Sequence, residues 1–152
     1  MIRVCGVGGS IYPDENIGNN VVDRLSKYKK IDGIEYYTSK KARETLVESI
    51  NEEDFVVIVE ATFYRIGVGM ITTMDIARYL EYIDYRDLGE SAIGSILSSK
   101  SYINGMVIGI DIPSIENLEP SAKLSERILE ITEEVKGIII KELQKHLDES
   151  VT

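Results

Sequence analysis

The sequence predicts an α/β protein: a single-domain, three-layer α/β/α sandwich with a mostly parallel central sheet. Short apolar runs of strand length alternate with segments whose apolar residues recur at helical spacing, which is the pattern of strand–helix–strand units. Residues 55–59 are apolar and rich in β-branched side chains, as in strands that are buried on both faces. The chain has 152 residues, of which 43% are hydrophobic and 28% charged, so we expect residues 1–152 to form one domain around one core.

The first half of the chain predicts two strand–helix pairs. Residues 2–7 are an apolar strand that ends in glycines, and a helix follows it. The apolar residues of this helix are spaced for one face: Ile17, Val21, Val22, Leu25 and Tyr28. Asp14, directly before the helix, can accept backbone N–H bonds from its first turn. Gly33 opens a second strand over residues 34–38, and Ser39 is expected to cap a helix that ends near Ile50.

The second half predicts the centre of the sheet and its covering helices. We expect strand 55–59 to end at Glu60 and residues 70–73 to form a short edge strand. A helix with Ile76, Leu80 and Ile83 facing inward follows, and then a second helix over residues 88–99. Residues 106–110 are expected to be the last central strand, and Ser125 the N-cap of a long final helix.

Composition excludes several classes of function. The formal net charge of -9 makes the surface repel phosphates, so we expect neither nucleic-acid nor membrane partners. We interpret the small basic cluster of Lys27, Lys29 and Lys30 as a solvated helix end. Cys5 is the only cysteine and lies in an apolar strand, where a thiol stays protonated and inert. No apolar stretch approaches membrane-spanning length. A single cysteine fits a reducing compartment, so we predict a cytoplasmic protein, and we expect it to be a monomer.

Two common catalytic or cofactor arrangements do not fit. Gly6, Gly8 and Gly9 suggest a dinucleotide-binding loop, but that fingerprint needs a third glycine where the chain has Ile11. The only histidine is His146, near the end of the final helix, so no histidine is placed to serve a Ser-His-Asp or Cys-His hydrolase. Zinc sites built from cysteine and histidine are excluded by the same count.

The most informative residues are two carboxylates that follow the most apolar strands. Glu15 lies in the loop after strand 2–7, and Glu60 ends strand 55–59. In a parallel sheet these positions converge on the crevice at the carboxyl ends of the strands, where such folds bind ligands. Glu15 also suits the first turn of a helix, which favours acids. Glu60 must be paired, bound to a metal or facing a cleft, because an unpaired buried carboxylate is costly.

Four segments, in order and at compatible spacing, resemble the hydrogenase maturation endopeptidases. Residues 6–18, G-V-G-G-S-I-Y-P-D-E-N-I-G, resemble the family opening G-I-G-N followed by D-(D/E)-G-(I/V/F)-G. Residues 57–61, V-I-V-E-A, resemble its I-I-V-D-A, and residues 86–88, R-D-L, fall where it has His-(D/N)-(L/M). Residues 109–116, G-I-D-I-P-S-I-E, with the later Leu124 and Ser125, are similar to its G-I-x-P-x-x-(I/V)-E and L-S segments.

This resemblance implies an α/β/α fold and a specific endopeptidase. Such enzymes remove the C-terminal extension of the precursor of a nickel-iron hydrogenase large subunit after nickel insertion, and they recognise the nickel through two acids and a histidine. Carried over, these positions are Glu15, Glu60 and Arg86, with Gly8, Gly9, Asp14 and Asp87 lining the site. The nickel is then presented by the substrate, and no other cofactor is implied.

Four positions depart from the family pattern. Glu60 replaces an aspartate, and Gly9 and Asn16 replace the family's Asn and Gly. Arg86 stands where the family has its imidazole, and a guanidinium offers no lone pair to a metal. We expect Arg86 to pair with Glu15 or Glu60, or else Asp87 or Glu90 to supply the third ligand. Two alternatives to a peptidase stay open: a non-catalytic homologue that keeps the fold and partner surface, and a small-molecule binder.

Overall fold

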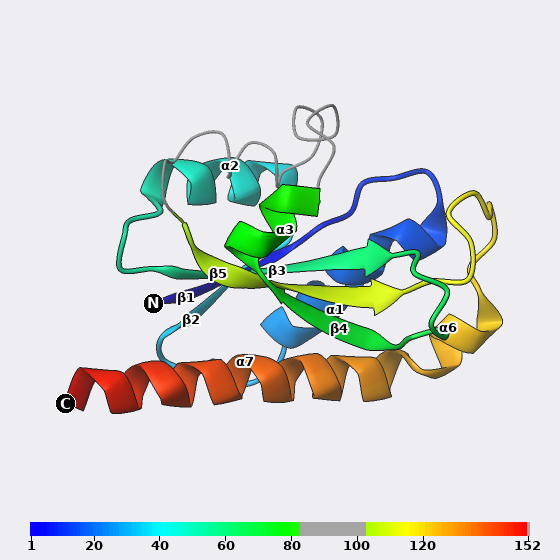
Figure 1. Ribbon diagram of the computed structural model, residues 1–152. Coiled ribbons are helices and arrows are strands. Elements are labelled where there is room, and N and C mark those ends of the chain that lie inside the picture. Colours follow the sequence, from blue (N-terminus) through cyan, green and yellow to red (C-terminus); the bar gives the residue numbers. More distant parts are fainter. Residues whose placement is uncertain (83–102, 152) are drawn as a thin grey trace.

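A computed structural model describes residues 1–82 and 103–151 of the chain (Figure 1). The elements in order are β1 (Ile2–Gly6), the 3-10 helix η1 (Pro13–Asn16), α1 (Ile17–Ser26), β2 (Ile34–Tyr37), α2 (Lys40–Ser49), β3 (Phe55–Thr62), β4 (Ile71–Asp75), α3 (Ile76–Tyr82), β5 (Asn104–Asp111), α6 (Ala122–Glu126) and α7 (Ile128–Val151). The predictions for Ile83, the helix over residues 88–99, Arg86, Asp87 and Glu90 concern residues outside those described.

The described strands form one five-stranded sheet in the order β2-β1-β3-β5-β4. Its first four strands are parallel, and β4 pairs antiparallel with β5 at the edge. Helices α1 and α7 cover one face, and α2 and α3 cover the other (Figure 1). The predicted three-layer α/β/α sandwich with a mostly parallel sheet is therefore confirmed.

The side-chain alternation of β3 divides the core between the two faces of the sheet. Val57 and Val59 belong to the apolar cluster under α1 and α7, while Val56 and Ile58 belong to the cluster under α2 and α3. All four are completely buried, because this central strand is covered on both faces as the unbroken apolar run predicts. Successive side chains alternate between faces, so Glu60 shares the α2–α3 side with Ile58.

Two predicted boundaries are wrong. Glu60 does not end its strand, because β5 runs beside β3 for two residues more, pairing Glu60 with Gly109 and Thr62 with Asp111. Ser125 does not cap the final helix. It lies inside the short α6, whose cap is Ser121, with its hydroxyl accepting a hydrogen bond from the Leu124 N–H at 3.4 Å. The long helix α7 starts only after the bend at Arg127.

Other local predictions are confirmed. The Ser39 hydroxyl accepts the Ala42 N–H at 3.0 Å and caps α2. Cys5 is fully buried, and burial raises the pKa of its thiol to about 12. Lys27 pairs with Asp23 at 3.0 Å at the exposed end of α1. Among the described helices, none combines the length and apolar character that a membrane span requires.

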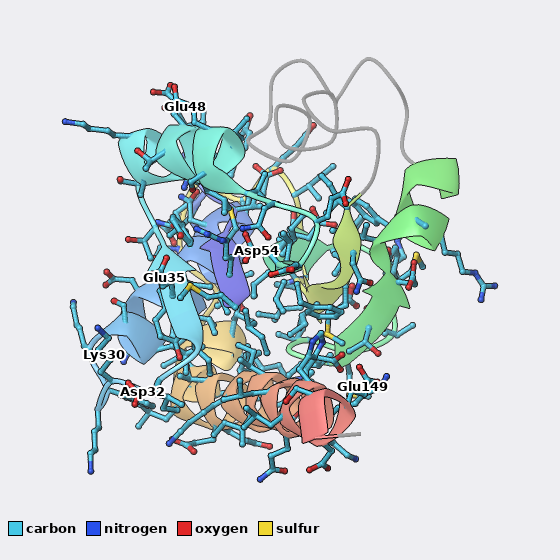
Figure 2. All side chains as sticks on the ribbon, turned by 90° about the vertical axis from the view of Figure 1, so that its left-hand side faces the viewer. Lys30, Asp32, Glu35, Glu48, Asp54 and Glu149 are labelled. Atoms are coloured by element: carbon cyan, nitrogen blue, oxygen red, sulfur yellow. The ribbon has the colours of Figure 1, made fainter. Side chains whose placement is uncertain are left out.

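The amino end of the sheet is held by an ion-pair network. Arg3 Nε lies 2.7 Å from Asp54, a carboxylate that is only 4% exposed. The same guanidinium donates to the Tyr37 hydroxyl at 2.7 Å, and that hydroxyl donates to Glu35. Figure 2 views the molecule from this end, with Glu35 and Asp54 labelled. The network joins β1, β2 and the start of β3.

Candidate functional site at the carboxyl end of the sheet

The loops that follow β1, β3 and β5 gather at one end of the sheet, on the right in Figure 1. This is the carboxyl end of the parallel strands, where folds of this class bind ligands. Backbone pairing with β3 extends one residue past the end of β1, because the Val7 N–H donates to the Val59 carbonyl at 2.9 Å. The Asn19 N–H in turn donates to the Val7 carbonyl at 3.0 Å, which ties α1 to the same end.

Gly18 permits the close approach of α1 to β3. A Cβ atom at Gly18 would lie 2.1 Å from the Val59 carbonyl oxygen and 2.9 Å from the Glu60 Cα, so a side chain there cannot be accommodated without displacing the backbone. Helix η1, which carries Glu15, directly precedes Gly18 along the chain. The structure therefore brings both predicted acids to the carboxyl end of the sheet.

Glu15 lies in η1, one turn before α1, and its side chain is held by the preceding loop. The Ser10 hydroxyl donates to its carboxylate at 2.6 Å and also accepts the Tyr12 N–H at 3.1 Å. Glu15 lies in the first turn of the 3-10 helix η1, which runs directly into α1, so the alternative interpretation as a first-turn acid also describes its position. Its carboxylate is half-buried and directed by a hydroxyl group, with no basic partner among the residues described.

Asn16 builds the loop that carries Gly8 and Gly9. Its side-chain oxygen accepts the N–H groups of Gly9 and Ser10 at 2.7 and 2.9 Å, and its amide nitrogen donates to the Ser10 carbonyl at 2.9 Å. Gly9 has a φ of 102°, which only glycine adopts without strain. Asn16, a departure from the family pattern, therefore has a structural role in this loop that its sequence position did not indicate.

Glu60 has the electrostatic character expected of a ligand-binding acid. Burial raises the pKa of its carboxyl group above the ordinary value of 4.5, and a hydrogen bond from the Tyr79 hydroxyl of α3 offsets part of this rise. In the described part of the chain no basic side chain forms an ion pair with Glu60. Among the described residues, the charge of Glu60 is therefore countered by a hydroxyl dipole and by no cation.

Asp111 organises the loop that follows Glu60. This carboxylate is 1% exposed and accepts the N–H groups of Tyr64, Ile66 and Gly67 at 2.7, 2.9 and 3.3 Å, together with the Thr62 hydroxyl at 3.1 Å. Burial by itself would raise the pKa of Asp111, but these donors outweigh it and hold the pKa below 3.8. The sequence analysis did not single out Asp111, although it too follows an apolar strand.

The loop that Asp111 holds brings Tyr64 near Glu60. The pKa of the Tyr64 phenol is raised by burial first and then by the negative charges of Glu60 and Asp111. Arg65 adopts a φ of 60° and stacks on the Phe63 ring at 5.1 Å. A positive φ is strained for a side chain of this size, and the Asp111 hydrogen bonds on either side of Arg65 hold the loop in this form.

The loops that follow β1, β3 and β5 also carry exposed apolar side chains. They are Ile11, Phe63, Tyr64, Ile66, Ile115 and Leu118, with exposures from 36% to 79%. Large side chains of this kind, gathered at one end of a molecule, are typical of surfaces that contact another protein.

Asp14 has a different role from the predicted one. Its carboxylate does not bond to the first turn of α1 but accepts the Ser121 N–H at 3.0 Å, linking η1 to the start of α6. The prediction failed because η1 separates Asp14 from α1. Asp14 is 4% exposed, so it is a buried residue that links η1 to the start of α6.

His146 lies at the opposite end of the molecule. It contacts the ring of Phe55, the first residue of β3, at 4.8 Å between centroids, and its Nε2 lies 3.3 Å from Glu142. Glu60 follows Phe55 by five residues along the same strand, which separates the two by roughly 16 Å at strand rise. The exclusion of His146 as a catalytic base at this site is therefore confirmed.

The described residues contain no group of three or more His, Cys, Asp or Glu side chains that could hold a metal ion. Two carboxylates suit hard cations, whereas nickel prefers imidazole as a ligand. The described acids alone therefore do not form a resident nickel centre, and a metal bound here would need further ligands from outside them.

The architecture and the acid-bearing carboxyl end define an α/β/α protein with a candidate ligand site at its strand ends. No protein-family model and no curated protein sequence matches the chain.

Among solved structures, the chain is similar to the hydrogenase maturating endopeptidase HybD of Escherichia coli, with a TM-score of 0.66, 22% identity and coverage of 93% of each chain. A nickel-iron hydrogenase maturation protease, HycI of Thermococcus kodakarensis, matches with a TM-score of 0.62, 20% identity and 90% of each chain. A hydrogenase 2 maturation peptidase from a Thaumarchaeota archaeon matches with a TM-score of 0.56, 22% identity, 94% of this chain and 97% of that one. The fold is therefore that of the hydrogenase maturation endopeptidases, as the sequence resemblance predicts.

Proposed function

We propose that this protein is an endopeptidase that removes the C-terminal extension of a nickel-iron hydrogenase large-subunit precursor, or of a related protein, after nickel insertion. The fold of known maturation endopeptidases, matched over 90% or more of the chain, supports this class of activity. The four sequence motifs, in order, support it independently. In this proposal the nickel belongs to the substrate and is gripped by Glu15 and Glu60.

The observation that carries the proposal is the burial of the Glu60 carboxyl group without a paired cation among the described residues. A carboxyl group with a pKa raised by burial, and with no cation paired to it among the described residues, gains most when a cation arrives from outside. Binding a metal requires the deprotonated form and releases a proton. Metal presented by a partner protein would therefore supply the charge that the site lacks.

The chemistry follows from the position of the metal in the substrate. A divalent ion polarises a nearby peptide carbonyl and favours attack by water. Glu15 and Glu60 fix the substrate through this ion, with Ser10 directing one carboxylate and Tyr79 the other. The apolar loop residues around the acids provide a surface for docking a large folded partner, so specificity would come mainly from that surface.

Incubation with a nickel-loaded large-subunit precursor tests the proposal, with loss of the C-terminal tail followed by mass spectrometry. We expect cleavage by the native protein and a fall of about 100-fold or more in Glu15→Gln and Glu60→Gln, since each change removes a charge that acts on the metal. Glu53→Gln is the matched control, because Glu53 is exposed before β3. Cleavage should be unchanged in this variant.

The same experiment separates the alternatives. A non-catalytic homologue would bind the precursor without shortening it, and its binding would tolerate Glu60→Gln. A small-molecule binder would neither cleave nor bind the precursor. Cytoplasmic location, the monomeric state and the pairing of Arg86 with an acid stay predictions.

A further inference from the structure

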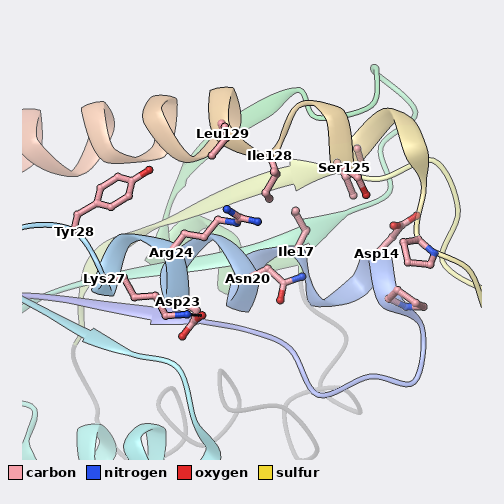
Figure 3. A pocket seen from close by; sticks show the side chains of 13 residues that line it. Asp14, Ile17, Asn20, Asp23, Arg24, Lys27, Tyr28, Ser125, Ile128 and Leu129 are labelled. Carbon is pink, nitrogen blue, oxygen red and sulfur yellow. Dashed lines mark ion pairs between the residues drawn. The ribbon is translucent and has the colours of Figure 1, made fainter.

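An open groove of about 660 Å³ lies between α1 and the start of α7 (Figure 3). Neither Glu15 nor Glu60 lines it. Its volume lies in the range of small-ligand sites, roughly 300–1,000 Å³. Both ends of the groove carry a charged group whose partner is missing from the described residues.

At one end lies Asp14. One of its oxygens accepts the Ser121 N–H, while Oδ2 is buried and has no hydrogen-bond partner in the described part of the molecule. Pro13 and Pro120 also line this end, and proline has no N–H to donate. A buried carboxylate oxygen without a donor is costly, and a positively charged N–H donor, such as an ammonium group, relieves that cost most fully.

Towards the other end lies Arg24. Its guanidinium is directed across the groove towards Ile128 in Figure 3. Within residues 1–82 and 103–151 no carboxylate pairs with Arg24, whereas the neighbouring Lys27 is occupied by Asp23. A planar guanidinium suits a carboxylate, to which it can donate two parallel hydrogen bonds.

The span between the two charges fits a short extended peptide. Ten residues separate Asp14 and Arg24, or roughly 15 Å at helical rise. An extended chain advances about 3.3 Å per residue, so four to five residues cover this distance. Ile128 and Leu129 supply an apolar wall between the ends, and Asn20 lines the groove with an amide that can bond to a peptide backbone.

We propose that this groove binds a short extended peptide, with its free amino terminus at Asp14, its terminal carboxylate at Arg24 and an apolar side chain against Ile128 and Leu129. Binding includes a small displacement of the Pro120 loop that opens Asp14 Oδ2 to the ammonium group. The proposal does not depend on the peptidase function, because none of the groove residues acts on the metal.

The test is an NMR titration with a pentapeptide of four alanines around a central leucine. We expect the form with both ends free to bind with a Kd below about 1 mM and to shift the resonances of groove residues. Acetylating its amino end or amidating its carboxyl end should each weaken binding about tenfold, the cost of one charge-assisted contact. In Arg24→Gln, the free and amidated peptides should bind equally, while the matched control Arg78→Gln, an exposed arginine on α3, should keep the tenfold preference.

Equal affinity for the free and doubly capped peptides would overturn the proposal, as would an absence of groove shifts at about 10 mM peptide. Asp14→Asn should abolish the preference for a free amino terminus. If this variant does not fold, the acetylated peptide and the Arg24 variant still decide the outcome, since both use a protein with Asp14 intact.

Discussion

The two ends of the sheet hold buried acids in opposite ways. At the amino end Asp54 is paired with Arg3 at 2.7 Å and lies 3.7 Å from the N-terminal amine. At the carboxyl end Asp111 is held only by N–H groups and a hydroxyl, and Glu60 only by Tyr79, with no cation on either within the described residues. The amino end thus carries its own countercharge, as a structural site requires. The carboxyl end leaves negative charge for a cation from outside, as a binding site requires.

The largest effect on stability is expected at the amino end. Asp54→Asn removes the buried carboxylate that lies 2.7 Å from Arg3 and leaves the guanidinium only the more exposed Glu35 at 3.6 Å. The free energy of unfolding should therefore fall by about 3 kcal/mol in urea denaturation. Cleavage of the precursor by the folded fraction should not change. The control is Asp23→Asn, which removes an exposed ion pair and should cost less than about 1 kcal/mol. Equal losses in both variants would contradict a buried structural pair.

Gly18→Ala tests the contact that brings α1 to the functional end. The added methyl group meets the Val59 carbonyl at 2.1 Å, so we expect a loss of about 2 to 3 kcal/mol in unfolding free energy and a loss of cleavage beyond it. Gly137→Ala on α7 is the matched control. Its methyl group meets open space, and alanine favours the helix by about 1 kcal/mol. A Gly18 variant as stable as the native protein would argue against the close approach.

Asp111→Asn should loosen the loop of Tyr64 and Ile66. The amide presents a donor to N–H groups that need an acceptor, so unfolding free energy should fall by about 2 kcal/mol at neutral pH. Because the folded pKa lies below the ordinary 3.8, this stabilisation is present above the ordinary value and is lost as pH falls through the folded pKa. Denaturation curves of the two proteins should therefore converge in acid. A constant difference at every pH would contradict the charge-assisted bonds.

Glu60→Gln should change stability least, and in the opposite direction. The pKa of Glu60 in the folded protein is raised above its ordinary value of 4.5. Between the ordinary pKa and the folded pKa, the folded state binds more protons than the unfolded state. The free energy of unfolding therefore falls as pH rises through this range. The uncharged amide escapes this cost. We expect a higher melting temperature at neutral pH, no difference below the ordinary value, and loss of cleavage. If the Glu60→Gln variant melts at a lower temperature than the native protein at neutral pH, burial does not destabilise the charged form of Glu60.

The secondary-structure pattern was readable because it rests on local periodicity. The strand around Val57 and the capped helix after Ser39 were predicted from burial patterns and capping chemistry that need only neighbouring residues. The predictions were wrong where contacts with a distant segment of the chain determine the end of a strand or the partner of a side chain. Strand β3 continues past Glu60 because β5 pairs with it. Asp14 accepts a hydrogen bond from the N–H of Ser121, more than a hundred residues later in the chain, and not from the first turn of α1.

The candidate site was only partly predictable. Glu15 and Glu60 are predicted as site residues because each follows an apolar strand, a signal carried by the sequence itself, and the structure places both at the carboxyl end of the sheet. Asp111 also follows an apolar strand, but its four donors come from the last residue of β3 and the loop after it, far earlier in the chain. The roles of Ser10 and Asn16 depend on how one loop folds back on itself, which spacing alone does not reveal.

By itself the sequence determined the layer architecture, the strand and helix order and the presence of two acids at strand ends, because hydrophobic period and strand direction fix these features locally. Only the tertiary structure decided which acids receive a countercharge. That choice depends on which distant groups lie beside a buried carboxylate. Among the described residues these are a guanidinium at Asp54, backbone N–H groups at Asp111 and the Tyr79 hydroxyl at Glu60. The free energy of a buried charge is set by these neighbours in space, whatever their distance along the chain.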